Sequence, residues 1–364
     1  MYALCRAGYI PDMLTISVTN PEVISEMLRE NDARALLHAS NLDLPVDCGI
    51  FSLTPVLNFE TLESDIDLPS VRVYNATDVA FINHTSGSTT KPKAVVCTNK
   101  WFESVYSSWT SVWNPAEEGA PQDVFTLPGS VCQPSGFHTL SVGIHLGGAF
   151  IQTSATPRNP SFPVDELVEL AREGGLNRMN TFAPLMIPYF MATQAQLKTG
   201  DDSILKVLRN MRSIVYGGMP LLPVFEDWAF ENQIPLMNSL GTTEAGPLLH
   251  SYLGHHPRHM VPFDGIDIEF EPQAKSSADE VQLFALIVLP TSPNIPSKAS
   301  CGDNGRFYTG DLFSRNEDGT YTHRGRDGDW IKVGNAYLID TKRIEEQLKT
   351  TCSDLIKQHV VVGD

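Results

Sequence analysis

The stretch His84-Thr85-Ser86-Gly87-Ser88-Thr89-Thr90-Lys91-Pro92-Lys93 concentrates hydroxyl groups, one glycine and two lysines in a single short segment. Apolar runs at residues 79–82 and 94–97 flank it and predict two strands. A loop of backbone N–H groups, hydroxyls and ammonium groups is suited to holding a polyphosphate. The Walker order G-x-x-x-x-G-K-[ST] is absent, so ATP hydrolysis at a Walker-type site is a distant alternative. A Ser/Thr/Gly run can also be an ordinary surface loop, so its assignment depends on the rest of the chain.

Five further segments stand in order along the chain, one before residues 84–93 and four after them. They are Arg6-Ala7-Gly8-Tyr9-Ile10-Pro11, Gly217-Gly218-Met219-Pro220, Leu240-Gly241-Thr242-Thr243-Glu244, Tyr308-Thr309-Gly310-Asp311 and Gly325-Arg326-Asp327-Gly328-Asp329-Trp330-Ile331-Lys332. Each is weak alone, since a lone Thr-Gly-Asp is normally a turn. Together with residues 84–93 they resemble the acyl-adenylate-forming enzymes, the superfamily of acyl-CoA synthetases, luciferases and peptide-synthetase adenylation domains.

A narrower resemblance lies near the end of the chain. Residues 329–332, Asn335, Asp340-Thr341 and Ile344-Glu345 are similar to adenylation domains of fungal nonribosomal-peptide-synthetase-like adenylate-forming reductases. In that family a carrier domain and an NADPH-dependent reductase domain follow. The chain has no carrier-type G-G-x-S and no G-x-x-G-x-x-G dinucleotide loop, so we expect those domains outside it.

The resemblance implies an α/β fold with a large adenylation domain of parallel sheets and helices plus a β-rich subdomain. We expect residues 1–327 to form this domain, without the N-terminal part that the family normally has. Residues 328–364 would be the hinge and the beginning of the small C-terminal subdomain. Tyr2 to Gly8 indicates the end of a helix, with Gly8 as its stop.

Alternating helix and strand patterns support this fold class. They predict helices at residues 164–171, 185–191 and 204–211, and strands at residues 179–182 and 214–216. Such alternation is typical of largely parallel sheets with sites at strand carboxyl ends. From residue 263 to residue 321 strands and turns dominate, and the Pro- and Ser-rich residues 290–300 indicate a surface loop.

An aromatic stripe follows the second predicted strand. Residues 98–99 are expected to cap the helix that carries the stripe. In the same way, Asn20 is expected to cap a helix that begins at Pro21. The stripe consists of Trp101, Phe102, Val105, Tyr106, Trp109 and Trp113. It could be a ligand box, but a buried helix face is the favoured interpretation.

Composition restricts the partners. At 364 residues the chain can bury a large core. Its formal charge of −17 opposes binding to nucleic acid or an anionic membrane. The longest apolar run, residues 283–289, is too short to span a bilayer and predicts a buried strand. Six cysteines without C-x-x-C spacing argue against a zinc site or a disulfide framework, and indicate a reducing, cytoplasmic compartment.

The resemblance implies ATP and Mg²⁺ as cofactors and assigns the residues that contact them. Glu244 would bind Mg²⁺, with Thr243 beside it on the phosphates, unless the two form a cap at a helix start. Asp311 would accept hydrogen bonds from the ribose hydroxyls, and Arg326 would fix the nucleoside, although it could be a surface ion pair. The remaining nucleotide contacts would come from Thr85, Ser86, Gly87, Ser88, Thr89, Lys93, Gly218, Gly241 and Thr242.

His138 bears on the acid substrate. At the matching place, amino-acid-activating domains carry an aspartate that pairs with the substrate ammonium group. A histidine removes that negative charge, which favours a non-amino acid. A lone histidine can equally be a satisfied core residue. The acid pocket is expected from residues 136–143, 182–187 and 217–240, which are rich in Leu, Met and Pro.

The function implied is ATP-dependent activation of a non-amino carboxylic acid, whether aryl, α-keto or fatty. The products would be acyl-AMP and pyrophosphate, followed by transfer to a thiol of CoA or of carrier-bound phosphopantetheine in secondary metabolism. Thr90 and the two ends of the chain, where parts of the family's domains are expected to be missing, support an alternative, a catalytically incompetent remnant that at most binds nucleotide. Three features depart from the family. Thr90 replaces a loop glycine, Gly328 occupies the hinge position, and the family's C-terminal lysine would lie beyond Asp364.

Overall fold

The computed structural model describes most of the chain. The described residues are 2–14, 18, 20–37, 51–53, 74–85, 92–113, 119–127, 134–156, 161–276, 281–333, 337–342, 344–345, 348 and 360–361. Among them, no helix is long and apolar enough to cross a bilayer.

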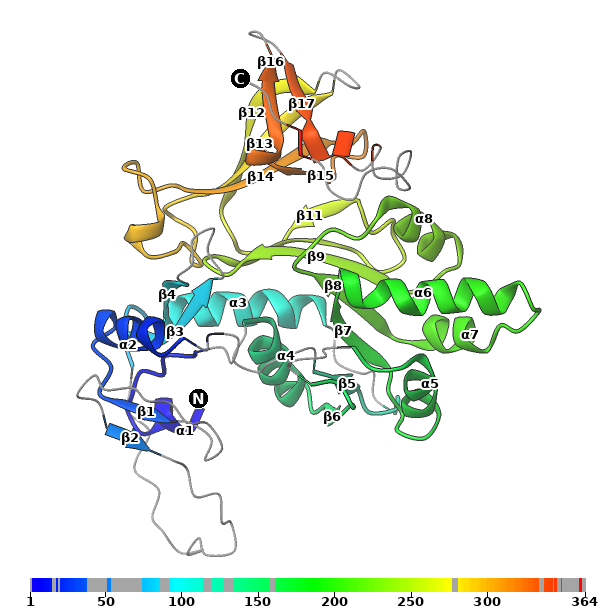
Figure 1. The fold of residues 1–364 in the computed structure, drawn as a ribbon, viewed down its shortest axis with the longest axis horizontal. Coiled ribbons are helices and arrows are strands. Elements are labelled where there is room, and N and C mark those ends of the chain that lie inside the picture. The colour runs from blue at the N-terminus through cyan, green and yellow to red at the C-terminus, as the bar shows by residue number, and fades with distance from the viewer. Residues whose placement is uncertain are drawn as a thin grey trace, which may run out of the picture.

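One half of the main sheet is parallel, as the alternating pattern predicted (Figure 1). In spatial order its strands are β6 (Ala149–Ile151), β5 (Val124–Thr126), β7 (Arg178–Phe182), β8 (Ser213–Gly217) and β9 (Leu236–Thr242). The helices of this half are α4 (Pro134–His145), α5 (Val164–Arg172), α6 (Ala183–Leu197), α7 (Ser203–Asn210) and α8 (Pro223–Glu231).

The other half of the same sheet is largely antiparallel, so the sheet is mixed rather than largely parallel. From β9 it continues through β10 (Gly246–Ser251), β11 (Met260–Pro262), β15 (Tyr321–Arg326), β14 (Phe307–Arg315), β13 (Gln282–Val288) and β12 (Ile268–Ser276). At the edge, β17 (Tyr337–Asp340) runs parallel to β12 and pairs with β16 (Trp330–Val333). The direction changes at β9 because a tight turn, not a crossover helix, joins β9 to β10. Two short 3₁₀ turns, Lys298–Ser300 and Asp327–Asp329, lie in the connections.

The N-terminal part supplies two small sheets. It contains α1 (Tyr2–Arg6), α2 (Pro21–Glu30), the parallel pair β1 (Ala35–Leu37) and β2 (Phe51–Leu53), and the antiparallel pair β3 (Val79–Thr85) and β4 (Lys93–Thr98). The two strands predicted around the phosphate loop are therefore confirmed. Helix α3 (Asn99–Val112) follows β4 directly, and the Thr98 hydroxyl caps it by accepting from Trp101 N.

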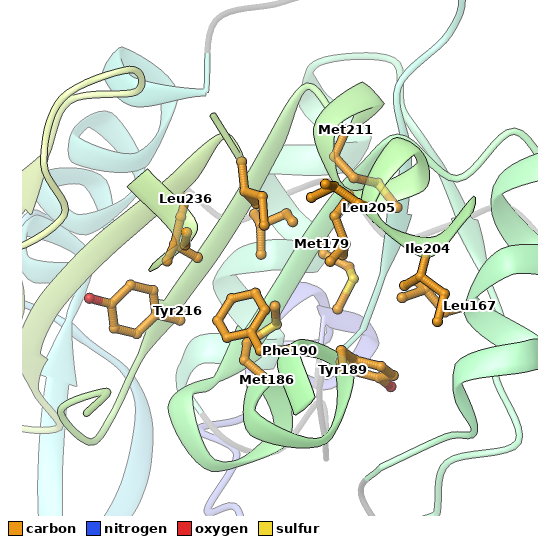
Figure 2. Close-up of a cluster of buried hydrophobic side chains, with 14 of the residues drawn as sticks. Leu167, Met179, Met186, Tyr189, Phe190, Ile204, Leu205, Met211, Tyr216 and Leu236 are labelled. Atoms are coloured by element: carbon orange, nitrogen blue, oxygen red, sulfur yellow. The ribbon is translucent and has the colours of Figure 1, made fainter. Parts of the chain in front are cut away.

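Strand β8 carries buried apolar residues on both faces because helices pack on both. Figure 2 shows the cluster on one of these faces, with Tyr216 of β8 among Met186 and Phe190 of α6. On β8, Ile214 and Tyr216 pack with α5, α6 and α7, whereas Val215 packs on the opposite face with α3. The α3 stripe is part of this second cluster, since Trp101, Val105 and Trp109 are buried. The buried-face interpretation of the stripe is confirmed.

Several elements differ from the sequence predictions. Helix α6 is much longer than residues 185–191, and Pro188 lies inside it. Helix α4, which contains two glycines, was not predicted; a Cβ on one of them, Gly143, would lie 2.4 Å from the Phe150 ring, so the glycine lets this ring pack directly against the helix. The loop expected at residues 290–300 is present, but only part of it lies at the surface: residues 291, 298 and 299 are exposed, whereas Ser292 and Asn294 are buried.

Candidate functional site

The carboxyl ends of β8 and β9 lie side by side and form the floor of the candidate site. Gly217 pairs with Ser239 across these strands, and a Cβ on Gly217 would lie 2.5 Å from the Ser239 carbonyl oxygen. Gly218 has φ of +75°, with Phe182 directly against it. Both glycines are therefore required by close backbone approach and by a left-handed turn.

A tight turn at residues 243–245 joins β9 to β10 and carries Glu244. The alternative that Thr243 and Glu244 cap a helix is wrong, because the next element is a strand. Ala245 N still donates to Thr242 Oγ1 at 3.0 Å, so a cap-like bond stabilises the turn. Gly241 sits in the hairpin where a Cβ would lie 2.4 Å from Gly246 O.

The Glu244 carboxylate is suitable for a hard cation. It is half-buried, and within the described part of the chain it makes no hydrogen bond or ion pair. The described residues contain no group of three or more His, Cys, Asp or Glu that could enclose a metal ion. One carboxylate is nevertheless enough for Mg²⁺, which usually keeps several waters and binds substrate phosphates. The donor set therefore fits Mg²⁺ bound together with a polyphosphate.

Asp311 and Arg326 meet across the β14–β15 hairpin, where they are register partners. The Asp311 side chain is nearly buried, and Arg326 Nε lies 3.6 Å from Asp311 Oδ1. His323 Nε2 lies 3.2 Å from the same oxygen. Gly310 has φ of +78°, and a Cβ there would lie 3.0 Å from Arg326 Nη2. The structure thus brings the two predicted nucleoside residues together and adds His323, which no local pattern in the sequence indicated.

His138 lies on α4 within an aromatic cluster. It is 3% exposed, and its ring centroid is 5.6 Å from that of Trp101 and 6.1 Å from that of Phe102. Neither ring nitrogen has a hydrogen-bond partner among the described residues. Burial lowers the pKa of His138 from its ordinary 6.5 to about 3, so the ring is neutral. The contact of His138 with the acid substrate stays a prediction.

The phosphate-loop residues are only partly within the described structure. Thr85 and Lys93 are register partners at the end of β3 and β4 where the phosphate loop joins the two strands. Ser86, Gly87, Ser88 and Thr89 lie outside the described residues, as does Thr90. The opposite end of this hairpin, at Thr98, adjoins the Glu244 turn, because α3 follows β4 directly there and Trp101 Nε1 donates to Glu244 O at 2.9 Å.

A small cavity lies at the carboxyl ends of β5 and β7. Its lining includes Thr126, Asn180, Leu185 and Tyr189. Of the predicted acid-pocket segments only residues 182–187 contribute to it. Asn180 donates to Thr139 Oγ1 on α4, so the cavity wall is tied to the helix that carries His138.

Comparison with known sequences identifies the class of protein to which this mixed sheet and these glycine-lined strand ends belong. The family described as AMP-binding enzyme matches residues 1–269. The chain therefore belongs to the AMP-binding enzyme family and is an adenylate-forming enzyme of the ligase type. This confirms the resemblance drawn from the six motifs.

Individual relatives include fungal enzymes. The AMP-binding domain-containing enzyme iboA of Amanita muscaria (strain Koide BX008) is 36% identical over 375 residues, covering 99% of this chain and 70% of iboA. The adenylate-forming reductase stbB of Stachybotrys bisbyi is 24% identical over 380 residues, covering all of this chain but 33% of stbB. The chain thus spans only part of the length of its relatives.

Solved structures show the same fold. O-succinylbenzoate coenzyme A synthetase (MenE) from Bacillus subtilis, in complex with ATP and magnesium ion, superposes with a TM-score of 0.72. The match covers 96% of this chain and 71% of that one at 17% identity. At this identity the likeness concerns the fold alone.

Proposed function

We propose that this protein uses Mg·ATP to activate a non-amino carboxylic acid as acyl-AMP, with release of pyrophosphate. The observation that carries the proposal is the Glu244 turn, where a half-buried carboxylate without a protein partner stands at the carboxyl end of β9. The buried Asp311, with Arg326 and His323 against it, offers the ribose an acceptor held in a fixed position.

Acid activation joins two anions, so these residues act mainly by alignment and charge neutralisation. Glu244 would hold Mg²⁺, which neutralises the polyphosphate when it is bound. Thr85, Lys93 and residues 86–89 would hold the β- and γ-phosphates, and Thr243 would add a hydroxyl donor. Gly218, Gly241 and Thr242 would let the nucleotide approach the backbone. Asp311 and Arg326 would fix the nucleoside.

The environment of His138 supports the choice of a non-amino acid. A neutral ring among Trp101, Phe102 and Phe137 offers an ammonium group no negative partner. A charged amino group there would lose hydration without forming an ion pair. Aryl, α-keto and fatty acids are therefore the proposed substrate classes.

The proposed acceptor and setting rest on the resemblance to fungal adenylate-forming reductases and to CoA ligases. We propose transfer to a thiol of CoA or of phosphopantetheine on a carrier domain outside this chain, in cytoplasmic secondary metabolism. Within the chain, residues 1–327 would be the large domain and residues 328–364 the hinge and the start of the C-terminal subdomain.

Acid-dependent exchange of labelled pyrophosphate into ATP tests the proposal. The full chain is incubated with Mg·ATP and, separately, an aryl, an α-keto, a fatty and an α-amino acid. Exchange is expected with at least one of the first three and not with the amino acid. AMP binding without exchange for any acid, also after a family C-terminal domain is added in trans, would favour the nucleotide-binding remnant.

A further inference from the structure

The Glu244 turn is held by side chains from distant parts of the chain. Trp101 Nε1, at the start of α3, donates to the carbonyl oxygen of Glu244 at 2.9 Å. Asn294 Nδ2, from the connection between β13 and β14, donates to the carbonyl oxygen of Ala245 at 2.8 Å. Two consecutive carbonyl groups of the turn therefore receive hydrogen bonds from two different directions.

The surroundings of Trp101 leave its indole little freedom. The side chain is 2% exposed and packs against the rings of Phe81 and His138. Its backbone N–H is held by the Thr98 hydroxyl at 3.2 Å. One helical turn further on, Val105 packs so closely on the hairpin that a Cβ at Gly246 would lie 2.5 Å from Val105 Cγ2. Helix α3 thus supports the turn by packing and by a directed hydrogen bond.

Asn294 is equally well placed. It is 1% exposed, and its Oδ1 accepts from Ser292 Oγ at 2.6 Å. Ser292 Oγ in turn accepts from the backbone N–H of Asp267 at 2.9 Å. Because the amide oxygen is occupied in this way, the amide nitrogen is directed at Ala245 O. The β-rich subdomain therefore contacts the Glu244 turn through a defined chain of hydrogen bonds.

We infer that Trp101 and Asn294 are positioning residues that hold the Glu244 turn in its Mg·ATP-binding conformation. This inference rests on the proposed role of Glu244. If either bond is lost, a buried carbonyl loses its partner and the turn has more conformations to lose when the ligand binds. The loss should appear in the affinity for Mg·ATP, because that ligand alone uses the Glu244 carboxylate, and not in the affinity for AMP.

Calorimetry of Mg·ATP and AMP binding to the full chain tests this. Trp101→Phe keeps an aromatic ring but removes the donor, and Asn294→Ala removes the donor from the other side. Each is expected to weaken Mg·ATP binding roughly twofold to tenfold, the range of one neutral hydrogen bond, with AMP binding unchanged. ATP without Mg²⁺ should lose less affinity than Mg·ATP.

Two variants serve as matched controls. Trp113→Phe changes another buried tryptophan next to the end of α3, whose Nε1 has no partner among the described residues. Asn316→Ala removes amide hydrogen bonds to Thr320 and Thr322 in the β14–β15 turn. Both should bind Mg·ATP as the wild type does. Melting temperatures identify any variant that does not fold. If one of Trp101→Phe and Asn294→Ala fails to fold, the binding data of the other still test the inference.

Glu244→Ala in the same experiment separates the inference from the proposed function. If Glu244→Ala weakens Mg·ATP binding while folded Trp101→Phe and Asn294→Ala bind like the wild type, the positioning role is overturned and the function stands. Equal losses of AMP and Mg·ATP affinity in the two positioning variants would also overturn it. If Glu244→Ala binds Mg·ATP as the wild type does, the proposed metal role of Glu244 is wrong, and the positioning inference that rests on it is overturned as well.

Discussion

Replacing Glu226 by glutamine should change how the stability of the protein depends on pH. Glu226 lies on α8 and is 4% exposed, and its Oε1 accepts from the Tyr216 hydroxyl at 2.5 Å. Arg258 Nε is 3.6 Å from Oε2, and Arg258 also pairs with Asp227, which binds His256 at 3.0 Å. Burial raises the pKa of Glu226 from its ordinary 4.5 to about 7, against the lowering effects of Tyr216 and Arg258.

The magnitude follows from this displacement. One pKa unit corresponds to about 1.4 kcal/mol, so the full effect is about 3 kcal/mol. Because the folded protein binds the proton more tightly than the unfolded chain, the contribution favours folding below the ordinary pKa. It is lost as the pH rises toward the folded pKa of about 7. Between about pH 5 and about pH 8 the wild type should lose roughly 2–3 kcal/mol relative to Glu226→Gln.

Urea unfolding followed by tryptophan fluorescence at several pH values measures this difference. The variant keeps an acceptor for Tyr216 and removes the titrating group, so its stability should fall less with rising pH. Glu231→Gln, at an exposed position on the same helix, is the control and should follow the wild type. Parallel curves for the wild type and Glu226→Gln would refute the reasoning, because no buried carboxyl would then titrate in this range.

Three further predictions concern the site. Asp311→Ala should weaken AMP and ATP together by about tenfold or more, whereas Glu244→Ala should weaken Mg·ATP and spare AMP. Calorimetry with both nucleotides measures these affinities. An equal loss of AMP affinity in Asp311→Ala and Glu244→Ala would contradict the two roles. His138→Phe should raise the free energy of unfolding by about 1–2 kcal/mol near neutral pH, since it removes two unpaired buried nitrogens. The difference in free energy of unfolding between His138→Phe and the wild type, measured by urea titration, should widen as the pH falls below 6.5. The reason is that the pKa of His138 in the folded protein is about 3, so only the unfolded wild type takes up this proton. Gly241→Ala should cost about 1–3 kcal/mol in thermal unfolding, since its Cβ would lie 2.4 Å from Gly246 O. If Gly241→Ala melts at the temperature of the wild type, the β9–β10 hairpin can accommodate a Cβ and the prediction is wrong.

The sequence was sufficient where the signal is local. A cap needs only neighbouring residues, so the helix starts after Asn20 and Thr98 were predictable. The strands around the phosphate loop and the strand at residues 283–289 follow from short apolar runs. The order of six motifs was enough to identify the family.

Elements whose limits depend on packing were predicted less well. Helix α6 is apolar on most sides and contains Pro188, so periodicity could not show its length. The residues after β9 turn back as an antiparallel strand, because Gly241 and Gly246 let the two backbones approach. Nothing in the local pattern separates that turn from the start of a helix.

By itself, the sequence determined the family and the α/β class, since both are written in short, ordered segments. The residues that would contact ATP were predicted from the same segments. Only the tertiary structure decided what holds Glu244 in place. Trp101 is 143 residues from Glu244, and Asn294 is 49 residues from Ala245. A hydrogen bond between residues so far apart depends on how sheet, helix and connection pack together, and that packing leaves no period or spacing in the chain.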